Sequence, residues 1–213
     1  MRRTIRLACC FLGLVIFACA GAVVSLAQAT GDVTATLPRE ETATFINELA
    51  SSEPFVRQQA AEELARRADT DHLKLVEGYR LQEKNARVKT ALDWTLYRMG
   101  KTEALFALVR ALDSSQAEQS AAYLAQLDSP APLYIFLGHT KRAAQVRLLN
   151  VLSKIGDAET LSRIKPLLDS FEPGVAAAAE LATEHINERL AQQPAEAQPT
   201  RPRQVGQTKE DTP

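Results

Sequence analysis

The sequence predicts an all-α protein in which helical hairpins are stacked side by side. Apolar residues follow the spacing of one helix face through most of residues 38–190, where no alternating pattern typical of strands occurs. A segment that ends one helix, turns and begins another occurs at residues 96–105 and again at 152–161. Such self-similarity is typical of repeat proteins, in which each hairpin buries its apolar faces against its neighbours.

Residues 1–29 precede the predicted helical domain and have the features of an export signal. Arginines lie at the very start, an apolar run follows at residues 7–26, and Ala27-Gln28-Ala29 has the small-x-small pattern of a signal-peptide cleavage site. We therefore expect a signal peptide at 1–29. The alternative is a retained N-terminal membrane anchor, because about 20 apolar residues are just long enough to span a bilayer.

Both alternatives predict export of the remaining chain across a bacterial-type inner membrane. The expected location is periplasmic or secreted after cleavage, or else anchored in the inner membrane. All three cysteines lie in residues 1–29, so the exported part can form no disulfide and has no cysteine metal ligand. The formal net charge is −1 and residues 1–29 hold no acidic residue, so the exported part is mildly acidic. This argues against nucleic acid as a partner, because nucleic acid requires a concentrated basic face.

The flanks of the predicted domain have different compositions. Residues 30–37 are expected to form a short linker, and residues 38–190 the repeat domain. Residues 191–213 are rich in proline and glutamine and almost without apolar side chains. Since such a segment cannot bury enough surface to offset the entropy of ordering, we predict a disordered tail.

The clearest hairpin supplies the template for the others. Val88, Leu92 and Leu96 share one face of its first helix. Gly100 is placed to close this helix, because glycine readily adopts a positive φ. Thr102 is predicted to cap the second helix of the hairpin.

The same spacing predicts where the other helices begin. With Val88 as the origin, equivalent first helices start near residues 56, 88, 116, 144 and 175, a period of about 30 residues. Helices at 38–51 and 174–190 are predicted to cap the two ends, since terminal units of a stack need a polar outer face.

Specific residues within these repeats point to a family. One repeat carries Val56-Arg57 followed by Ala60-Ala61, and a later one closes with Ile155-Gly156-Asp157. This pattern resembles the short HEAT-like (PBS-lyase-type) helical repeat, and the resemblance implies a short right-handed α-solenoid of about four to five hairpins with capping helices. The repeat near Gln116 departs from the pattern and contains Pro130-Ala131-Pro132. Tetratricopeptide repeats are the alternative, but their period of about 34 residues and their aromatic and glycine pattern are absent.

The polar residues indicate neither catalysis nor a bound cofactor. His72 and His139 lie at helix ends, and His185 has no second histidine four residues away for a zinc pair. Di-iron hydroxylases that share the resembled fold carry repeated His-Glu dipeptides, which this sequence lacks. Bilin lyases share the fold too, but they act on photosynthetic antenna proteins, which does not suit an exported chain. We therefore predict that the protein is not an enzyme and holds no cofactor or metal.

The repeat register predicts a partner-binding row on the second helices, which line the concave face of a solenoid. The equivalent positions are Lys74, Phe106, Tyr134 and Ser162. Two neighbouring aromatic side chains would make a binding hot spot, and Arg110, one turn beyond Phe106, could add a charged contact. The alternative for Tyr134 is that the helix after Pro130 tilts, so that the ring packs between repeats.

Trp94 is a second candidate for partner binding. It lies well away from the middle of the apolar stripe of its helix, so it could be an exposed anchor for a partner or a membrane surface. The alternative is that Trp94 is wedged against the neighbouring repeat.

These features together predict a non-catalytic protein–protein interaction scaffold of the cell envelope. Its partner is expected to be another envelope protein, bound on the concave face, with the membrane touched only through an uncleaved N-terminal segment. The alternatives are a membrane-anchored adaptor, and an enzyme or enzyme accessory factor of the HEAT-like lyase or hydroxylase type.

Overall fold

The computed structural model describes residues 37–192, with side chains from residue 41 onward. The chain divides into two units, residues 1–37 and 38–213, and almost all of the described part belongs to the second. The predicted signal peptide or anchor lies outside the described residues, as do nearly all of the predicted linker and tail. No helix in residues 37–192 is long and apolar enough to cross a membrane.

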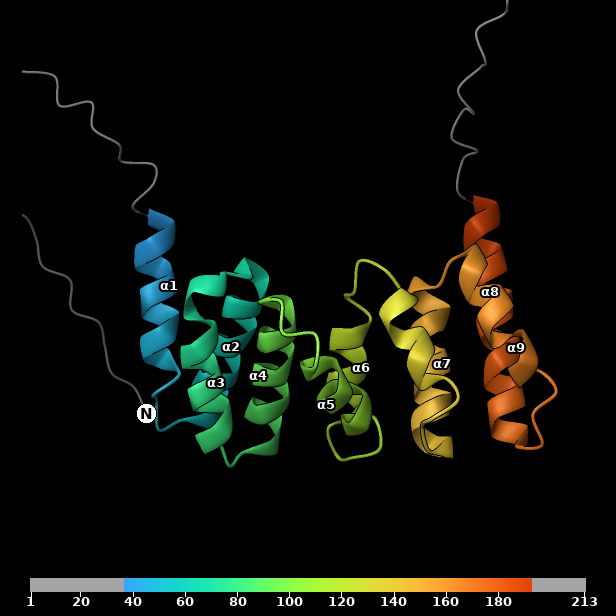
Figure 1. Cartoon of the computed structure of the whole chain (residues 1–213), viewed down its shortest axis with the longest axis horizontal. Helices are drawn as coiled ribbons and strands as arrows, with labels where there is room; N and C mark the ends of the chain where they lie inside the picture. The colour runs from blue at the N-terminus through green and yellow to red at the C-terminus, as the bar shows by residue number, and fades with distance from the viewer. Residues whose placement is uncertain (1–36, 193–213) are drawn as a thin grey trace, which may run out of the picture. The chain divides into compact units, whose positions relative to one another are not determined.

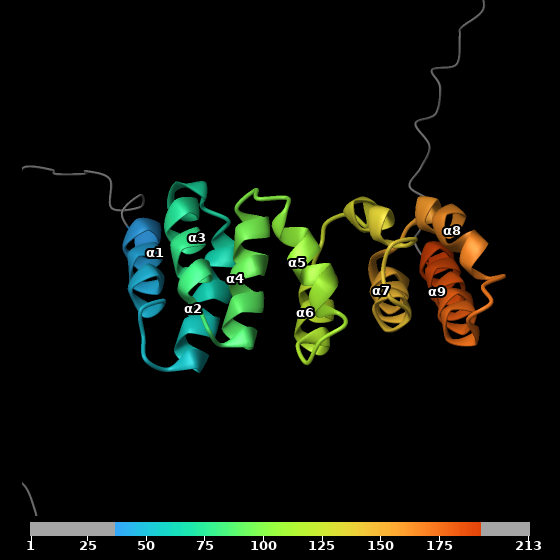
Figure 2. The same ribbon diagram turned by 60° about the horizontal axis from the view of Figure 1, so that its bottom comes forward.

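The described residues form helices joined by short turns, with no strand among them, and consecutive helices follow one another along a row (Figures 1 and 2). The all-α prediction is therefore confirmed. The helices are α1 (Leu37–Glu48), α2 (Pro54–Arg67), η1 (Thr70–His72), α3 (Leu73–Gln82), α4 (Ala86–Arg98), α5 (Ala104–Ala111), α6 (Ala117–Leu124), η2 (Ala131–Phe136), α7 (Arg142–Ile155), α8 (Ala158–Ile164), η3 (Lys165–Leu167) and α9 (Pro173–Gln192), where η denotes a 3₁₀ helix.

The helices follow the predicted order of first and second helices along the chain. Each first helix is followed by a second one, α2 by α3, α4 by α5, α6 by η2 and α7 by α8, and every first helix begins within a few residues of its predicted origin. The first helices pack against one another in succession, α2 on α4, α4 on α6, α6 on α7 and α7 on α9. Their inward faces form one continuous core, in which Leu64, Leu92, Leu124, Leu148 and Ile186 are almost fully buried.

Side chains also join successive pairs by hydrogen bonds to backbone carbonyls. The buried Thr95 hydroxyl on α4 donates to the Ala61 carbonyl of α2, 2.7 Å away. Arg147 on α7 donates to the Leu112 carbonyl at 2.6 Å, and Arg189 on α9 donates to that of Ser153 at 2.8 Å. The carbonyls of Leu112 and Ser153 lie at helix ends, where a carbonyl lacks a partner within its own helix, so these two bonds satisfy groups that burial would otherwise penalise.

The Arg57 that marks the HEAT-like motif holds the first pair together. Its guanidinium donates to both carboxylate oxygens of Glu83, at 2.8 and 3.0 Å, and to the Ser51 carbonyl at 2.8 Å. Glu83 in turn accepts from the backbone N–H of Asn85, which begins the next pair. These bonds, chiefly those from Arg57, hold the pKa of Glu83 below its ordinary value.

The predicted role of Gly100 in ending α4 is confirmed, whereas the predicted helix cap at Thr102 is not formed. Gly100 ends the α4 turn with φ of 98°, in the region that glycine favours. Thr102 does not cap α5, because α5 begins at Ala104 and Glu103 occupies the N-cap position. At the start of α4, the side chain of Asn85 caps the helix by accepting hydrogen bonds from the backbone N–H groups of Arg87 and Val88.

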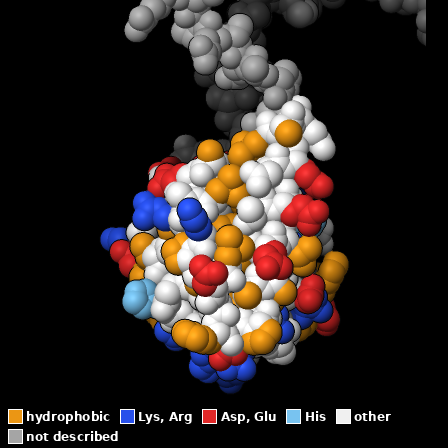
Figure 3. All heavy atoms as spheres, turned by 90° about the vertical axis from the view of Figure 1, so that its right-hand side faces the viewer, with side chains coloured by type: hydrophobic (Ala, Val, Ile, Leu, Met, Phe, Trp, Pro, Cys, Tyr) orange, Lys and Arg blue, Asp and Glu red, His pale blue; other side chains and the backbone are white. Residues whose placement is uncertain are grey.

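Helices α1 and α9 occupy the ends of the stack, as predicted. The inner face of α9 is made of small apolar residues, with Ala178, Ala179 and Ala182 buried. Its outer face exposes Glu180 and Glu184. Figure 3, which views the end formed by α8 and α9, shows acidic side chains dispersed among apolar ones. A charged outer face of this kind keeps the last helix soluble without a further repeat to cover it.

Gly156 lies at a tightly packed junction between α7 and α9. A Cβ atom at this position would lie 2.5 Å from the Leu152 carbonyl oxygen and 2.7 Å from Cδ1 of Ile186. Gly78, in the middle of α3, would place its Cβ in open space.

We therefore expect opposite effects from two glycine substitutions. Gly156→Ala should lower the free energy of unfolding by about 1–3 kcal/mol, because the added methyl overpacks the junction of α7 and α9. Gly78→Ala should raise it by about 0.5–1 kcal/mol through helix propensity. Urea denaturation of both variants measures these changes, and a neutral Gly156→Ala would contradict the close packing of α7 on α9.

Candidate partner-binding groove

The second helices carry most of the large apolar side chains that remain exposed on the described surface. Phe106 on α5 is 54% exposed, and Ile135 on η2 is 59% exposed. Leu75 and Leu81 on α3 are also exposed. Leu75, Phe106 and Ile135 occupy equivalent positions of successive second helices to within one residue. Exposed apolar side chains gathered on one set of helices are typical of an interaction surface.

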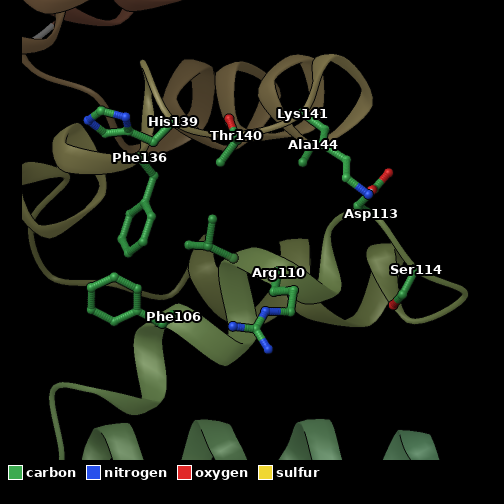
Figure 4. Close-up of a pocket in the computed structure, with 10 residues that line it drawn as sticks. Phe106, Arg110, Asp113, Ser114, Phe136, His139, Thr140, Lys141 and Ala144 are labelled. Atoms are coloured by element: carbon green, nitrogen blue, oxygen red, sulfur yellow. The ribbon is translucent and has the colours of Figure 1, made fainter.

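A groove lies beside Phe106, between α5 and the segment that joins η2 to α7 (Figure 4). It has a volume of about 420 Å³. The Phe106 ring meets the Phe136 ring edge-to-face, with centroids 5.0 Å apart and planes at 76°. Val109 and Ala144 add apolar surface to the lining. We call this hollow the Phe106 groove.

Charged groups lie around the rim of the Phe106 groove. Arg110, one turn after Phe106, lines it and makes no ion pair within the described part of the chain. Lys141 pairs with Asp113 at 3.1 Å at the other end, which Figure 4 shows opposite the two phenylalanines. Asp113, the one acidic group in the lining, is thus already paired with a cation, and Arg110 leaves the rim with an uncompensated positive charge.

Two of the predicted site residues, Phe106 and Arg110, therefore meet in one groove. Lys74 is exposed on α3 and does not line it. Phe136 and Lys141 were not predicted as site residues. Phe136 could have been found from its i, i+3 spacing with the buried Leu133, which is the repeat of a 3₁₀ helix.

Tyr134 lies elsewhere, as the alternative for this residue predicted. Its hydroxyl bonds to Thr160 Oγ1 at 2.8 Å and to Asp157 Oδ1 at 3.1 Å, and its ring lies under the Arg163 guanidinium at 5.5 Å. The pairing of Tyr134 with Phe106 is therefore wrong. The cause is that η2 has about three residues per turn rather than 3.6, which rotates Phe136 into the place expected for Tyr134.

Trp94 is buried, so its prediction as an exposed anchor is wrong. It is 4% exposed, and its ring stacks between those of Tyr97 and Tyr123, with centroids 5.9 and 5.7 Å away. The Tyr123 hydroxyl donates to Glu62 at 2.6 Å. These residues come from α2, α4 and α6, so the aromatic cluster joins three successive repeats and Trp94 is wedged against its neighbour.

The histidines lie apart from one another. His72 lies 3.9 Å from Asp69 at the start of α3, and His185 is exposed on α9. His139 lines the Phe106 groove, although Figure 4 shows its ring turned away from the hollow. Within residues 37–192, no group of three or more histidine, cysteine, aspartate or glutamate side chains could hold a metal ion.

Comparison with known proteins agrees with the repeat pattern. Residues 42–128 match the family model described as HEAT repeats. No curated protein matches the chain. A crystal structure of an engineered protein from the Northeast Structural Genomics Consortium is similar at 20% identity, covering 68% of this chain and 79% of the engineered one, with a TM-score of 0.33. The HEAT-like resemblance expected from the sequence is thus confirmed for residues 42–128, which hold α2 to α6 and one side of the Phe106 groove.

Trp94→Ala should strongly destabilise the protein. Truncating a buried tryptophan removes its packing and leaves a cavity, so the free energy of unfolding should fall by about 3–5 kcal/mol. Phe171→Ala is the matched control, because Phe171 is fully exposed and its truncation should change stability by less than about 0.5 kcal/mol. Urea denaturation that finds the two variants equally stable would contradict the buried aromatic cluster.

Asp157 should make stability depend on acid pH. Burial raises its pKa, but hydrogen bonds from the Thr160 N–H and hydroxyl and from the Tyr134 hydroxyl outweigh burial, so the pKa lies below its ordinary value. The stabilisation by the ionised carboxylate is therefore present above the unfolded-state pKa of about 4 and is lost as the pH falls through the lower folded-state pKa.

Asp157→Asn should accordingly lower Tm at pH 7 and have a smaller effect once the pH falls below the folded-state pKa, where the parent carboxyl is protonated. Thermal unfolding across this range measures the difference. Asp128→Asn is the control, because the Asp128 side chain is 94% exposed. If the Tm difference between Asp157→Asn and the parent stays constant with pH, the charge of the carboxylate does not contribute to stability.

Proposed function

We propose that this protein is a non-catalytic scaffold of the cell envelope that binds another protein through its second helices. HEAT repeats are associated with protein partners in general, and residues 42–128 match them. The observation that carries the proposal is the half-exposed Phe106 beside a groove of about 420 Å³, on a helix whose other large apolar residues, Leu105, Leu108 and Val109, are buried. An aromatic anchor of this kind, next to an arginine, is the usual composition of a binding hot spot.

The second helices offer more than one hollow to such a partner. A further cavity of about 330 Å³ lies between α3 and α5, where the exposed Leu81 and the half-buried Ala107 contribute to the lining. Helix α5 therefore separates two hollows, one on each side. A partner that crosses α5 could place side chains in both, and Lys74 on α3 is proposed as a contact at the far end of this surface.

Envelope localisation is part of the same proposal. It is supported by the arginine-rich start, the apolar run at 7–26 and the Ala27-Gln28-Ala29 pattern, all properties of the sequence. Absence of cysteine beyond residue 19 is compatible with an exported domain that relies on packing alone.

Affinity capture from envelope extracts tests the proposal. The mature chain, residues 30–213, should capture a specific envelope protein. The Phe106→Ala variant should capture much less of that protein, because truncating a hot-spot aromatic costs about 2 kcal/mol or more of binding energy. Phe171→Ala removes a fully exposed aromatic that does not line the Phe106 groove and should capture the protein as the parent does. Unfolding midpoints of all three proteins show whether a loss reflects folding.

Two results would contradict the proposal. Equal capture by Phe106→Ala and the parent would move the binding surface away from the Phe106 groove. A captured protein that resides only in the cytoplasm would contradict envelope localisation, even if its binding depended on Phe106.

A further inference from the structure

Resting on the proposed function, we infer that the Phe106 groove takes an acidic peptide segment of the partner. In this complex an apolar side chain of the segment fills the groove, and a carboxylate next to it pairs with Arg110. The inference names the chemistry of the partner, which the HEAT-like resemblance does not.

The two phenylalanines provide the apolar part of this binding site. Phe136 is 7% exposed and held in the core, and it fixes one edge of the Phe106 ring through their edge-to-face contact. The remaining half of Phe106 faces solvent. Covering it with an apolar side chain removes that surface from water at little entropic cost, because the ring is already oriented.

Arg110 provides the charged part of this binding site. Its guanidinium has no acidic partner within the described residues, whereas Asp113, the one carboxylate of the lining, is occupied by Lys141. The rim is therefore positive in a chain whose formal net charge is negative. An arginine guanidinium matches a carboxylate with two parallel hydrogen bonds, so a segment with aspartate or glutamate complements this rim.

The same charges place the carboxylate of the segment. Figure 4 shows Arg110 between Phe106 and Asp113, with Asp113 and Lys141 at the end away from the two phenylalanines. Since Lys141 is already paired with Asp113, Arg110 is the cation of the lining that remains for the carboxylate. One unpaired cation in the lining, Arg110, does not favour nucleic acid as the ligand, because nucleic-acid binding depends on contacts to many phosphates.

A titration with defined peptides tests the inference. The probes are the peptide Ser-Gly-Asp-Leu-Phe-Glu-Ser-Gly, its amide counterpart with Asn and Gln in place of Asp and Glu, and a counterpart with Ala-Ala in place of Leu-Phe. Amide chemical shifts of the mature chain are followed by NMR up to about 1 mM peptide, which detects even weak binding. The acidic peptide should bind about tenfold or more tightly than either counterpart, and raising the salt to about 0.5 M should reduce this advantage.

Variants of Arg110 supply the matched controls. Arg110→Glu should abolish binding of the acidic peptide, and Arg110→Lys should keep part of it, since the charge remains without the bidentate geometry. Lys165→Glu makes the same charge change at an exposed lysine outside the groove and should bind as the parent does. Because Arg110 is exposed, none of these changes should alter folding, which the NMR spectra show directly.

Each contrary result overturns the inference in a recognisable way. Equal binding of the acidic and amide peptides, equal binding by Arg110→Glu, or no shift changes near Phe106 at the highest peptide concentration would each contradict it. Binding that appears only after residues 193–213 are deleted would show that the chain's own segment fills the groove, and concentration-dependent dimerisation lost in Phe106→Ala would show a second copy there. If partner capture still depends on Phe106 in these cases, the proposed scaffold function stands and only the acidic-segment inference fails.

Discussion

The packing of first helix on first helix is the interaction on which the rest of this structure depends. Helices α2, α4, α6, α7 and α9 cover one another in turn, and no first helix could bury its apolar stripe alone. The junctions are close enough that Thr95 reaches the Ala61 carbonyl and that only glycine fits at position 156. Because each repeat completes the core of its neighbour, the second helices are held in a regular order without having to be buried themselves.

Because the first helices form most of the core, a binding surface can form on the second helices. The first helices use their large side chains for the core, and even Trp94 is enclosed by rings from α4 and α6. Helix α5 buries Leu105, Leu108 and Val109 and leaves Phe106 half exposed. The third repeat widens this opening, since its second helix is a short 3₁₀ segment that follows a proline. The Phe106 groove thus arises where the repeat pattern is least regular.

Local patterns in the sequence were sufficient for the fold. The spacing of Val88, Leu92 and Leu96 and the glycine at 100 predicted the helix starts, because periodicity and turn chemistry are properties of nearby residues. The site was predicted only in part, since its geometry depends on residues distant in sequence. The burial of Trp94 requires Tyr123 from the next repeat, and the place of Tyr134 depends on the 3₁₀ geometry that Pro130 and Pro132 favour.

The most direct test of this account is site-specific photo-crosslinking in living cells. A photoreactive phenylalanine analogue placed at position 106 of the full chain should form a covalent adduct with one envelope protein. The same analogue at position 171, which is more accessible than position 106 and does not line the groove, should form none. Adducts of the same protein from both positions, or from 171 alone, would contradict the account that the groove between α5 and α7 is the partner-binding surface.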